Sequence, residues 1–513
     1  MSTIEAVPAT PPLSSPQVFA VTGREPSQAG SLPAKAPRLT SLDVFRGATI
    51  AAMVLVNMQP EPKYWPLDHV QWHGWTPTDL IFPFFLFIMG VATPFSLGKR
   101  AATGSRKTLL AHIWARAISL FALGELLTGL PYNSFSEIPH GYEWIKALRL
   151  ALAVLCVIGV LLLLIPWRSK ALSLWLPPIV FVLFYVAAVA CHLIIKHTSG
   201  LPDDFSWGNG LLNPLHLRIP GVLQRIGICY GIAATIGLFF GWRMVLLWAI
   251  GLMTLYSWLM LTVPFTPSQY VDKSVPRTAN GKVVGLLTKT DNLSRRVDEW
   301  LLIRAGRWNH AYGSYPDNEG ALSTLPSIAE VLLGILAGVW LRTFRPAAER
   351  GMGLLVFGLF TLLAGLALNR WLMPINKNIW TPSFTVFTAG MALLCLGTVF
   401  YFVDVLGRRA WALPFKIYGM NAIAAFVGYG LLYRLLIVIK LKKETGAPNA
   451  WGWYEHHVYM GMDQLANALG HITPRLAAFN TGENRSLVFA LSYVVVVCLL
   501  MSILYVCKIF VKV

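Results

Sequence analysis

The sequence predicts an all-α, polytopic membrane helix bundle of about 12 transmembrane helices with both termini in the cytoplasm. Hydrophobic residues make up 55% of the 513 residues and charged residues only 13%, about half of the ~25% usual in soluble proteins. The apolar residues gather into long, nearly uncharged runs that match the thickness of a bilayer. These observations exclude a soluble enzyme, a disordered chain and a disulfide-stapled secreted domain.

The formal net charge of +18 does not indicate a nucleic-acid partner. The basic residues lie mostly in the connections between apolar runs, where they set topology, and no DNA- or RNA-reading pattern occurs. The six cysteines all fall inside apolar runs, which predicts packed thiols rather than disulfides or a metal site. We therefore expect no nucleic acid and no metal.

The elements follow from the hydropathy pattern in chain order. Residues 1–37 are rich in Pro, Ala and Ser and have no apolar core, which predicts a disordered cytoplasmic tail. Residues 38–513 form the transmembrane domain. We expect spans at 42–58, 77–97, 108–130, 146–166, 171–195, 219–240, 243–263, 325–341, 352–372, 380–402, 411–437 and 487–510.

Loop charges orient these spans. Alternate connections hold most of the basic residues, among them the run from Lys99 to Lys107 and the pair Arg408 and Arg409. Because positive charge stays on the cytoplasmic side, these connections face the cytoplasm, and the long loops 264–324 and 438–486 are extracytoplasmic. The short loop after the first span also lies outside, so a site there faces away from the cytoplasm.

Polar residues in the first span point to a functional helix face, because such groups are costly in lipid. Arg46 and Asn57 lie almost three full turns apart on one face, separated by about 16 Å along the axis. Asp43 precedes Arg46 by one turn and can pair with it. Whether this pair serves a ligand or only anchors the helix at the headgroups stays open.

The segment from Asp68 to Asp79, which follows the first span and which we call the rim, is rich in groups able to move protons. His69 and His73 are four residues apart, but no helix start precedes Pro77 and no third ligand is evident, so zinc is not expected. A neutral imidazole suits a general base or an acyl acceptor better. Asp79 lies within reach of such an imidazole in sequence.

Several ordered motifs carry a resemblance to a known family. They are the Leu-Asp-Val-Phe-Arg-Gly run ending at Gly47, Val56-Asn57, the stretch from His69 through Trp72 and Gly74 to Pro83, Phe87–Gly90, Arg218–Arg225, Ile375–Trp380 and Tyr418–Asn421. Together they resemble the heparan-α-glucosaminide N-acetyltransferase family over residues 38–513. That family transfers the acetyl group of cytoplasmic acetyl-CoA to a terminal glucosamine across the membrane.

The resemblance implies the site residues. His69 corresponds to the active-site histidine and Asn57 to its partner asparagine, which we expect to donate to the developing oxyanion. Asp79 would orient His69, which accepts the amine proton or is transiently acetylated. The candidate contacts for acetyl-CoA are Arg46, Arg225, Asn378, Ser383, Asn421, Lys508 and Lys512.

Two departures from the family pattern bear on the acceptor. His73 stands where the family has Asn, and residues 146–195 form an apparent inserted hairpin. The first bears on local hydrogen bonding. The hairpin, together with the N-terminal luminal domain and extra first helix that the animal enzymes add to this pattern, favours a bacterial inner-membrane protein acting on a small amino sugar or glycan, in contact with the lipid bilayer. A homodimer, O-transfer in place of N-transfer, and an acetyl-histidine in place of a ternary complex all stay open. The alternative function is a secondary transporter of an amino sugar such as N-acetylglucosamine.

Overall fold

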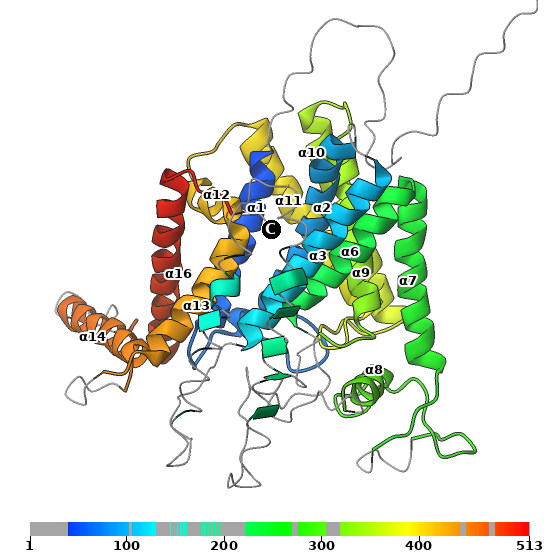
Figure 1. Ribbon diagram of the computed structural model, residues 1–513, viewed down its shortest axis with the longest axis horizontal. Coiled ribbons are helices and arrows are strands. Elements are labelled where there is room, and N and C mark those ends of the chain that lie inside the picture. The colour runs from blue at the N-terminus through cyan, green and yellow to red at the C-terminus, as the bar shows by residue number, and fades with distance from the viewer. Residues whose placement is uncertain are drawn as a thin grey trace, which may run out of the picture.

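The computed structural model is an all-helical bundle (Figure 1). It describes residues 39–101, 105–129, scattered positions from 144 to 194, and residues 221–268, 275–303, 319–441, 448–470 and 478–511. Within these ranges, eight helices are long and apolar enough to cross a membrane, or nine if one bent pair forms a single span. The prediction of a polytopic all-α protein is confirmed.

The candidate spans correspond to predicted ones. They are α2 (Ile81–Ala101) with the preceding 3₁₀ turn η2 (Pro77–Leu80), α3 (Arg106–Gly129), α6 (Val222–Phe239), α7 (Trp242–Thr262), α9 (Thr324–Leu341), α10 (Ala347–Trp371), α11 (Pro382–Phe400) with its π-helical extension η7 (Tyr401–Val405), and α16 (Gly482–Val506). The bent pair is α12 (Leu413–Met420) with α13 (Ala422–Val438).

Three predicted spans are not in this set. The first is the helix α1 (Thr40–Asn57), whose polar residues lower its hydropathy although most of its side chains are buried. The spans predicted at 146–166 and 171–195 lie mostly outside the described residues, as does the tail 1–37. The total of about 12 and the side of each terminus therefore stay predictions.

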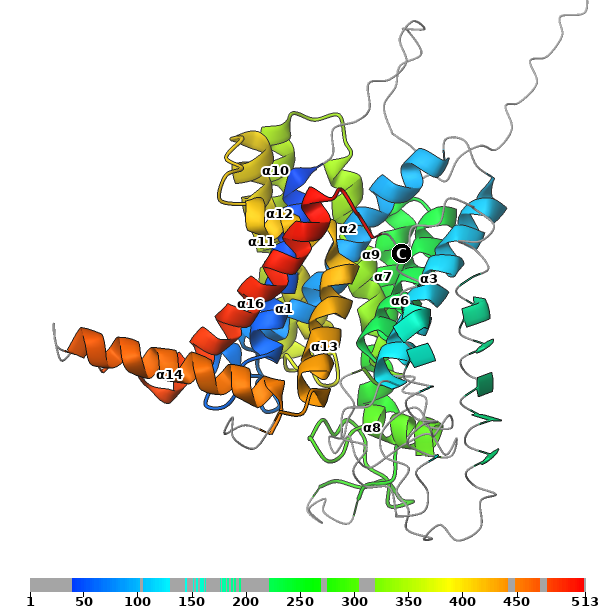
Figure 2. The same cartoon turned by 60° about the vertical axis from the view of Figure 1, so that its left-hand side comes forward.

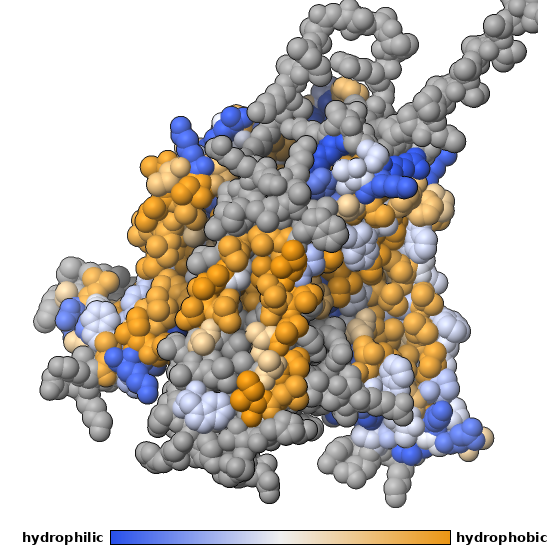
Figure 3. Space-filling view, viewed as in Figure 1, coloured by the Kyte–Doolittle hydropathy of each residue, from blue (hydrophilic) through white to orange (hydrophobic). Residues whose placement is uncertain are grey.

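The burial of the helices separates the core from the lipid-facing surface. The window that defines α6 is 72% buried, whereas that of α10 is only 22% buried. Exposed Leu, Val and Phe side chains cover α10, α7 and α16, and Figure 3 shows an apolar band over the middle of the bundle with polar residues near its ends. This distribution is what a bilayer around the bundle requires.

The helix α1 lies at the centre of one half of the bundle, against α12. A Cβ atom on Gly47 would lie 1.7 Å from the carbonyl oxygen of Phe415, and one on Gly419 would lie 1.7 Å from that of Asp43. Only glycine permits so close an approach of two backbones. Just beyond Gly419, the chain turns by 87° at Asn421 between α12 and α13.

Two connections at one end of the bundle carry structure of their own (Figures 1 and 2). The loop predicted at 438–486 contains the helix α14 (Ala450–Gly470), which runs across the start of α16. The loop predicted at 264–324 contains α8 (Leu293–Asp298). Neither helix was expected, because a hydropathy pattern marks only the spans.

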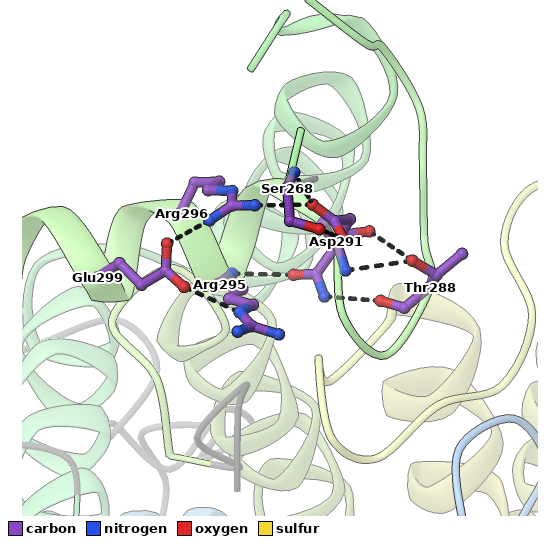
Figure 4. Close-up of polar contacts among 7 residues, drawn as sticks. Ser268, Thr288, Asp291, Arg295, Arg296 and Glu299 are labelled. Atoms are coloured by element: carbon purple, nitrogen blue, oxygen red, sulfur yellow. Dashed lines mark hydrogen bonds and ion pairs between the residues drawn. The ribbon is translucent and has the colours of Figure 1, made fainter. Parts of the chain in front are cut away.

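A polar network fixes the loop around α8 (Figure 4). The Asp291 carboxylate is fully buried and accepts hydrogen bonds from Ser268 and from Arg296 Nη2, the latter at 2.7 Å. Arg296 also contacts Glu299 at 2.6 Å, and Asn292 caps the start of α8. Burial would raise the pKa of Asp291, but these hydrogen bonds hold it below its ordinary value.

Candidate active site

Asp79 is the buried anchor of the site. The 3₁₀ turn η2 begins at Pro77, where the missing N–H costs nothing, and places Asp79 at its third position. The carboxylate oxygen Oδ2 accepts from the N–H and the hydroxyl of Thr76, both at 3.0 Å, and from the N–H of Val70 at 3.3 Å. These donors leave the other oxygen, Oδ1, to face His69.

His69 lies directly against Asp79, as the sequence predicted. The Nδ1 atom is 2.7 Å from Asp79 Oδ1, and about half of the imidazole side chain (52%) is exposed. A carboxylate cannot donate, so the proton of a neutral imidazole lies on Nδ1 and points to Asp79. The lone pair of Nε2 is then free, which is the tautomer that a general base or an acyl acceptor needs.

Lys377 completes this group from the connection between α10 and α11. Its Nζ atom is 3.1 Å from Asp79 Oδ1 and 3.0 Å from His69 Nδ1, and only 12% of its side chain is exposed. Burial lowers the pKa of Lys377, and the charge of Asp79 opposes that effect. The sequence analysis passed over Lys377 as a site residue, and its only signal was a charge inside the Ile375–Trp380 motif.

Backbone and side-chain contacts hold the rim and the 372–381 connection together. The N–H of Gly74 donates to the carbonyl of Ile375 at 2.8 Å, and the Nδ1 of His73 is 3.2 Å from the Nδ2 of Asn376. Gly74 has a φ of 103°, which favours glycine. Burial lowers the pKa of His73, because it disfavours the charged imidazole.

The indole of Trp72 joins the rim to the loop that contains α8. Its Nε1 donates to the carbonyl of Leu287 at 2.9 Å, a few residues before the Asp291 network. The loop that contains α8 therefore lies at the same end of the bundle as His69.

Arg225 lies at this end too, near the start of α6. Its guanidinium donates to Ser327 Oγ at 3.2 Å, to the carbonyl of Gly320 at 2.8 Å and to the hydroxyl of Ser323. The same group lies over the ring of Trp380 at 5.2 Å. Arg225 thus ties the start of α9 to the connection that carries Lys377.

Two more candidate contacts belong to that connection or to the helix after it. Asn378 is half-buried in the turn next to Lys377. Ser383 is fully buried at the start of α11, with its hydroxyl 3.0 Å from that of Thr381. These positions place both residues near the His69 end rather than near the opposite end of the bundle.

Asn57 ends α1 and contacts a side chain of α13. Its Nδ2 donates to the Tyr429 hydroxyl at 3.0 Å, and its side chain is exposed. Two residues later, Gln59 is only 4% exposed, and neither its amide oxygen nor its nitrogen has a hydrogen-bond partner among the residues that the structure describes. A buried amide without partners is costly, so Gln59 is a polar group suited to a ligand, and the sequence analysis missed it.

The remaining candidates lie at the opposite end of α1. Arg46 Nη1 is 3.5 Å from Asp43 Oδ1 and donates to the carbonyl of Gly419 at 3.4 Å. Lys508 is exposed and has a φ of 56°, while Lys512 lies outside the described residues.

Asn421 binds the chain itself. Its Nδ2 donates to the carbonyl of Ile509 at 3.0 Å, and its Oδ1 accepts from the N–H of Val511 at 2.9 Å. Both polar atoms of the side chain are thereby used to hold the segment after α16. Asn421 remains only a predicted cofactor contact, and its observed partners are protein.

Comparison with known proteins agrees with the motifs. Residues 38–215 match the family model described as heparan-alpha-glucosaminide N-acetyltransferase, catalytic. The chain is 26% identical to the human heparan-alpha-glucosaminide N-acetyltransferase over 440 residues, and 27% identical to the mouse protein of the same name over 437 residues. Over most of its length the chain is therefore similar to the human and mouse heparan-alpha-glucosaminide N-acetyltransferases.

The extent of this homology bears on the site. The alignments cover 78% and 77% of the chain but 53% and 54% of the human and mouse proteins, so the chain spans about half the length of these relatives. His69, Asp79 and Asn57 lie within the residues that match the family model. Lys377 lies beyond that match, and the structure alone joins it to the site.

Proposed function

We propose that this protein is a membrane-bound acetyltransferase that moves the acetyl group of acetyl-CoA to the amino group of an amino sugar or a small glycan. The observation that carries the proposal is the contact between the exposed imidazole of His69 and the buried carboxylate of Asp79, at 2.7 Å. The homology to the heparan-alpha-glucosaminide N-acetyltransferases supports the same reaction class.

The site residues supply the chemistry of acyl transfer. As the acceptor nitrogen forms its bond to the thioester carbonyl carbon, His69 Nε2 takes the proton of that nitrogen. The C–S bond then breaks, and the leaving thiolate takes the proton from His69 Nε2, which returns the imidazole to its neutral form. Asp79 holds the imidazole in the required tautomer and compensates the charge that the imidazole gains. Asn57 would donate its amide N–H to the oxyanion, a contribution of about 3–4 kcal/mol.

The polar groups near Asn57 and Trp380 fit the acyl end of such a donor. Within the described part of the chain, neither the buried amide of Gln59 nor the buried indole N–H of Trp380 has a hydrogen-bond partner. Arg46 and Lys508, at the opposite end of α1, would contact the phosphates as cations. We infer that the donor enters from that basic end, which is the cytoplasmic side by the distribution of charge.

Acetyl transfer by the purified protein in detergent tests the function. With acetyl-CoA and glucosamine, the wild type should form an acetylated sugar and free thiol, and His69→Ala should form neither while it keeps its folded elution profile. Detergent removes any gradient, so turnover there excludes the transporter alternative. If the wild type forms no thiol with any amino sugar, or if His69→Ala turns over normally, the proposal fails.

Sidedness needs a separate measurement. Trp65 is 71% exposed just before the rim that carries His69, whereas Cys507 is exposed at the opposite end of the bundle. In right-side-out vesicles, a membrane-impermeant maleimide should label a cysteine introduced as Trp65→Cys, and Cys507 only after the vesicles are opened. Labelling in the reverse order would place the site on the cytoplasmic side.

A further inference from the structure

Lys377 has no role in the reaction described above, yet its ammonium touches both members of the His69–Asp79 pair. The contacts come from a segment about 300 residues further along the chain, and they lie within hydrogen-bond distance of both partners. A buried cation beside an imidazole that must accept a proton changes the reaction, because like charges repel most strongly where water is scarce.

We propose that Lys377 is a positioning residue of this site, whose ammonium shares Asp79 Oδ1 with the His69 N–H and opposes protonation of Nε2. The inference rests on the proposed function for its role in turnover. Its consequence is that His69 meets the acceptor as a neutral base, although a buried carboxylate lies against its other nitrogen.

The hydrogen-bond geometry gives His69 and Lys377 different contacts with Asp79. Asp79 Oδ1 accepts from His69 Nδ1 at 2.7 Å and from Lys377 Nζ at 3.1 Å. An Nδ1 atom that carries a proton has no lone pair for the ammonium, so the 3.0 Å contact between His69 and Lys377 is a close approach without a hydrogen bond. Lys377 therefore fixes the carboxylate and, through it, the tautomer.

The charges around His69 set the balance. Among the described residues, those that face it are Asp68 on its own loop, Asp79 on η2, and Lys377, with Glu319 acting on Lys377 from before α9. Asp79 favours the protonated imidazole and Lys377 disfavours it. The charges of Asp79 and Lys377 cancel while the imidazole is neutral, so His69, Asp79 and Lys377 together carry a charge of +1 when the imidazole is protonated. Asp68 and Glu319 act in the opposite sense.

Labelling of His69 by diethyl pyrocarbonate tests the inference without acetyl-CoA. This reagent acylates only the neutral imidazole, and the 52% exposed side chain of His69 is open to it. Mass spectrometry of the peptide follows the modification from about pH 5 to about pH 8, around the ordinary titration range of histidine. The measured quantity is the pH of half-maximal labelling.

Removal of either charge should move this midpoint in opposite directions. In Lys377→Met the midpoint should rise by about one pH unit, a tenfold change in proton concentration, and in Asp79→Asn it should fall. Lys377→Arg keeps the positive charge, so its labelling midpoint should match that of the wild type. This variant also tests the role of the charge if Lys377→Met folds poorly. Lys377→Gln offers a second neutral variant in that case.

A merely structural role for Lys377 predicts a different pattern. Its loss would lower activity at every pH and leave the labelling midpoint the same as in the wild type. That result would overturn the inference. If the midpoints shift as expected but the wild type transfers no acetyl group, the proposed function fails while the charge balance at His69 stands. If transfer occurs and the midpoints coincide, only the role of Lys377 fails.

Discussion

Replacing Asp79 by Asn removes one charge and leaves the shape of the side chain unchanged. The carboxylate receives five polar contacts, three on Oδ2 and two on Oδ1. An amide has a single oxygen, and the three backbone and hydroxyl donors on the Oδ2 side will claim it. The NH₂ group then faces His69 and Lys377, which are both donors in the wild type.

Two separable effects follow from this reversal. The Nδ1 of His69 must become an acceptor, so the proton moves to Nε2 and the base is lost; the same exchange in serine-protease triads costs about 10⁴ in kcat. Lys377, whose side chain is only 12% exposed, loses the carboxylate that pairs with it. Breaking a buried ion pair in this way costs about 3–5 kcal/mol of stability. We expect both losses in Asp79→Asn.

Asp291→Asn is the matched control. Asp291 is also fully buried and also pairs with a cation, Arg296 at 2.7 Å, but it lies in the loop that contains α8 rather than beside His69. It should lose stability in thermal unfolding and keep its rate per folded molecule. Equal losses of kcat in the two variants would refute the argument, since the effect would then come from unfolding.

A second control separates charge from tautomer. The double variant Asp79→Asn/Lys377→Met removes the unpaired cation, so it should regain part of the melting temperature lost in Asp79→Asn. It should not regain activity, because the amide still faces His69 Nδ1. Full recovery of kcat in the double variant would contradict the assignment of Asp79 as the group that sets the tautomer.

Two further predictions concern the other polar groups. Asn57→Ala should lower kcat by about 10²–10³ with little change in stability, because its exposed amide is expected to stabilise the oxyanion. Tyr429→Phe removes the hydrogen bond between Asn57 and Tyr429 and should leave kcat within a few-fold of the wild type. Equal losses of kcat in the two variants would assign the effect to the contact between α1 and α13. The pKa of Asp291 is below its ordinary value in the folded chain, so its stabilising effect is complete above about pH 4 and is lost as the pH falls through the lowered value. Melting curves of the wild type should therefore fall more steeply in acid than those of Asp291→Asn, and parallel curves would contradict this.

The spans were predictable because lipid imposes a simple rule on sequence. An apolar run of the right length marks a helix whatever its partners are. The pattern fails at the ends: α10 begins at Ala347 and α16 at Gly482, five residues before the expected starts at 352 and 487. In both helices the first turn holds polar residues that can lie among headgroups, so it is helical without being apolar.

The interruption at Asn421 escaped the same reasoning. The run 411–437 reads as one span, but the chain bends by 87° between α12 and α13. The break is stable because the side chain of Asn421 binds the backbone of Ile509 and Val511, which follow α16. A partner so far along the chain leaves no mark in the local pattern.

The site was predictable in part for a related reason. His69 and Asp79 are ten residues apart, and a rim loop that returns to the bundle can bring them together. Lys377 reaches the same oxygen from another connection, and its position depends on how Ile375 and Asn376 dock on the rim. No spacing rule relates two loops separated by several spans, so the structure was needed to place Lys377 beside His69 and Asp79.

The structure also divides the predicted cofactor contacts between two ends of the bundle. Arg225 bonds to the residues that precede α9 and lies over Trp380, three residues after Lys377, whereas Arg46 lies beside Gly419 at the far end of α1. Along α1, the axial distance from Arg46 to Asn57 is about 16 Å. A single donor molecule that touches both groups must therefore extend along the bundle, with its phosphates at Arg46 and its thioester near His69. In that arrangement Arg225, which lies over Trp380, would hold the connection that carries Lys377 and would act on the proposed reaction by fixing the reacting end rather than by binding phosphate.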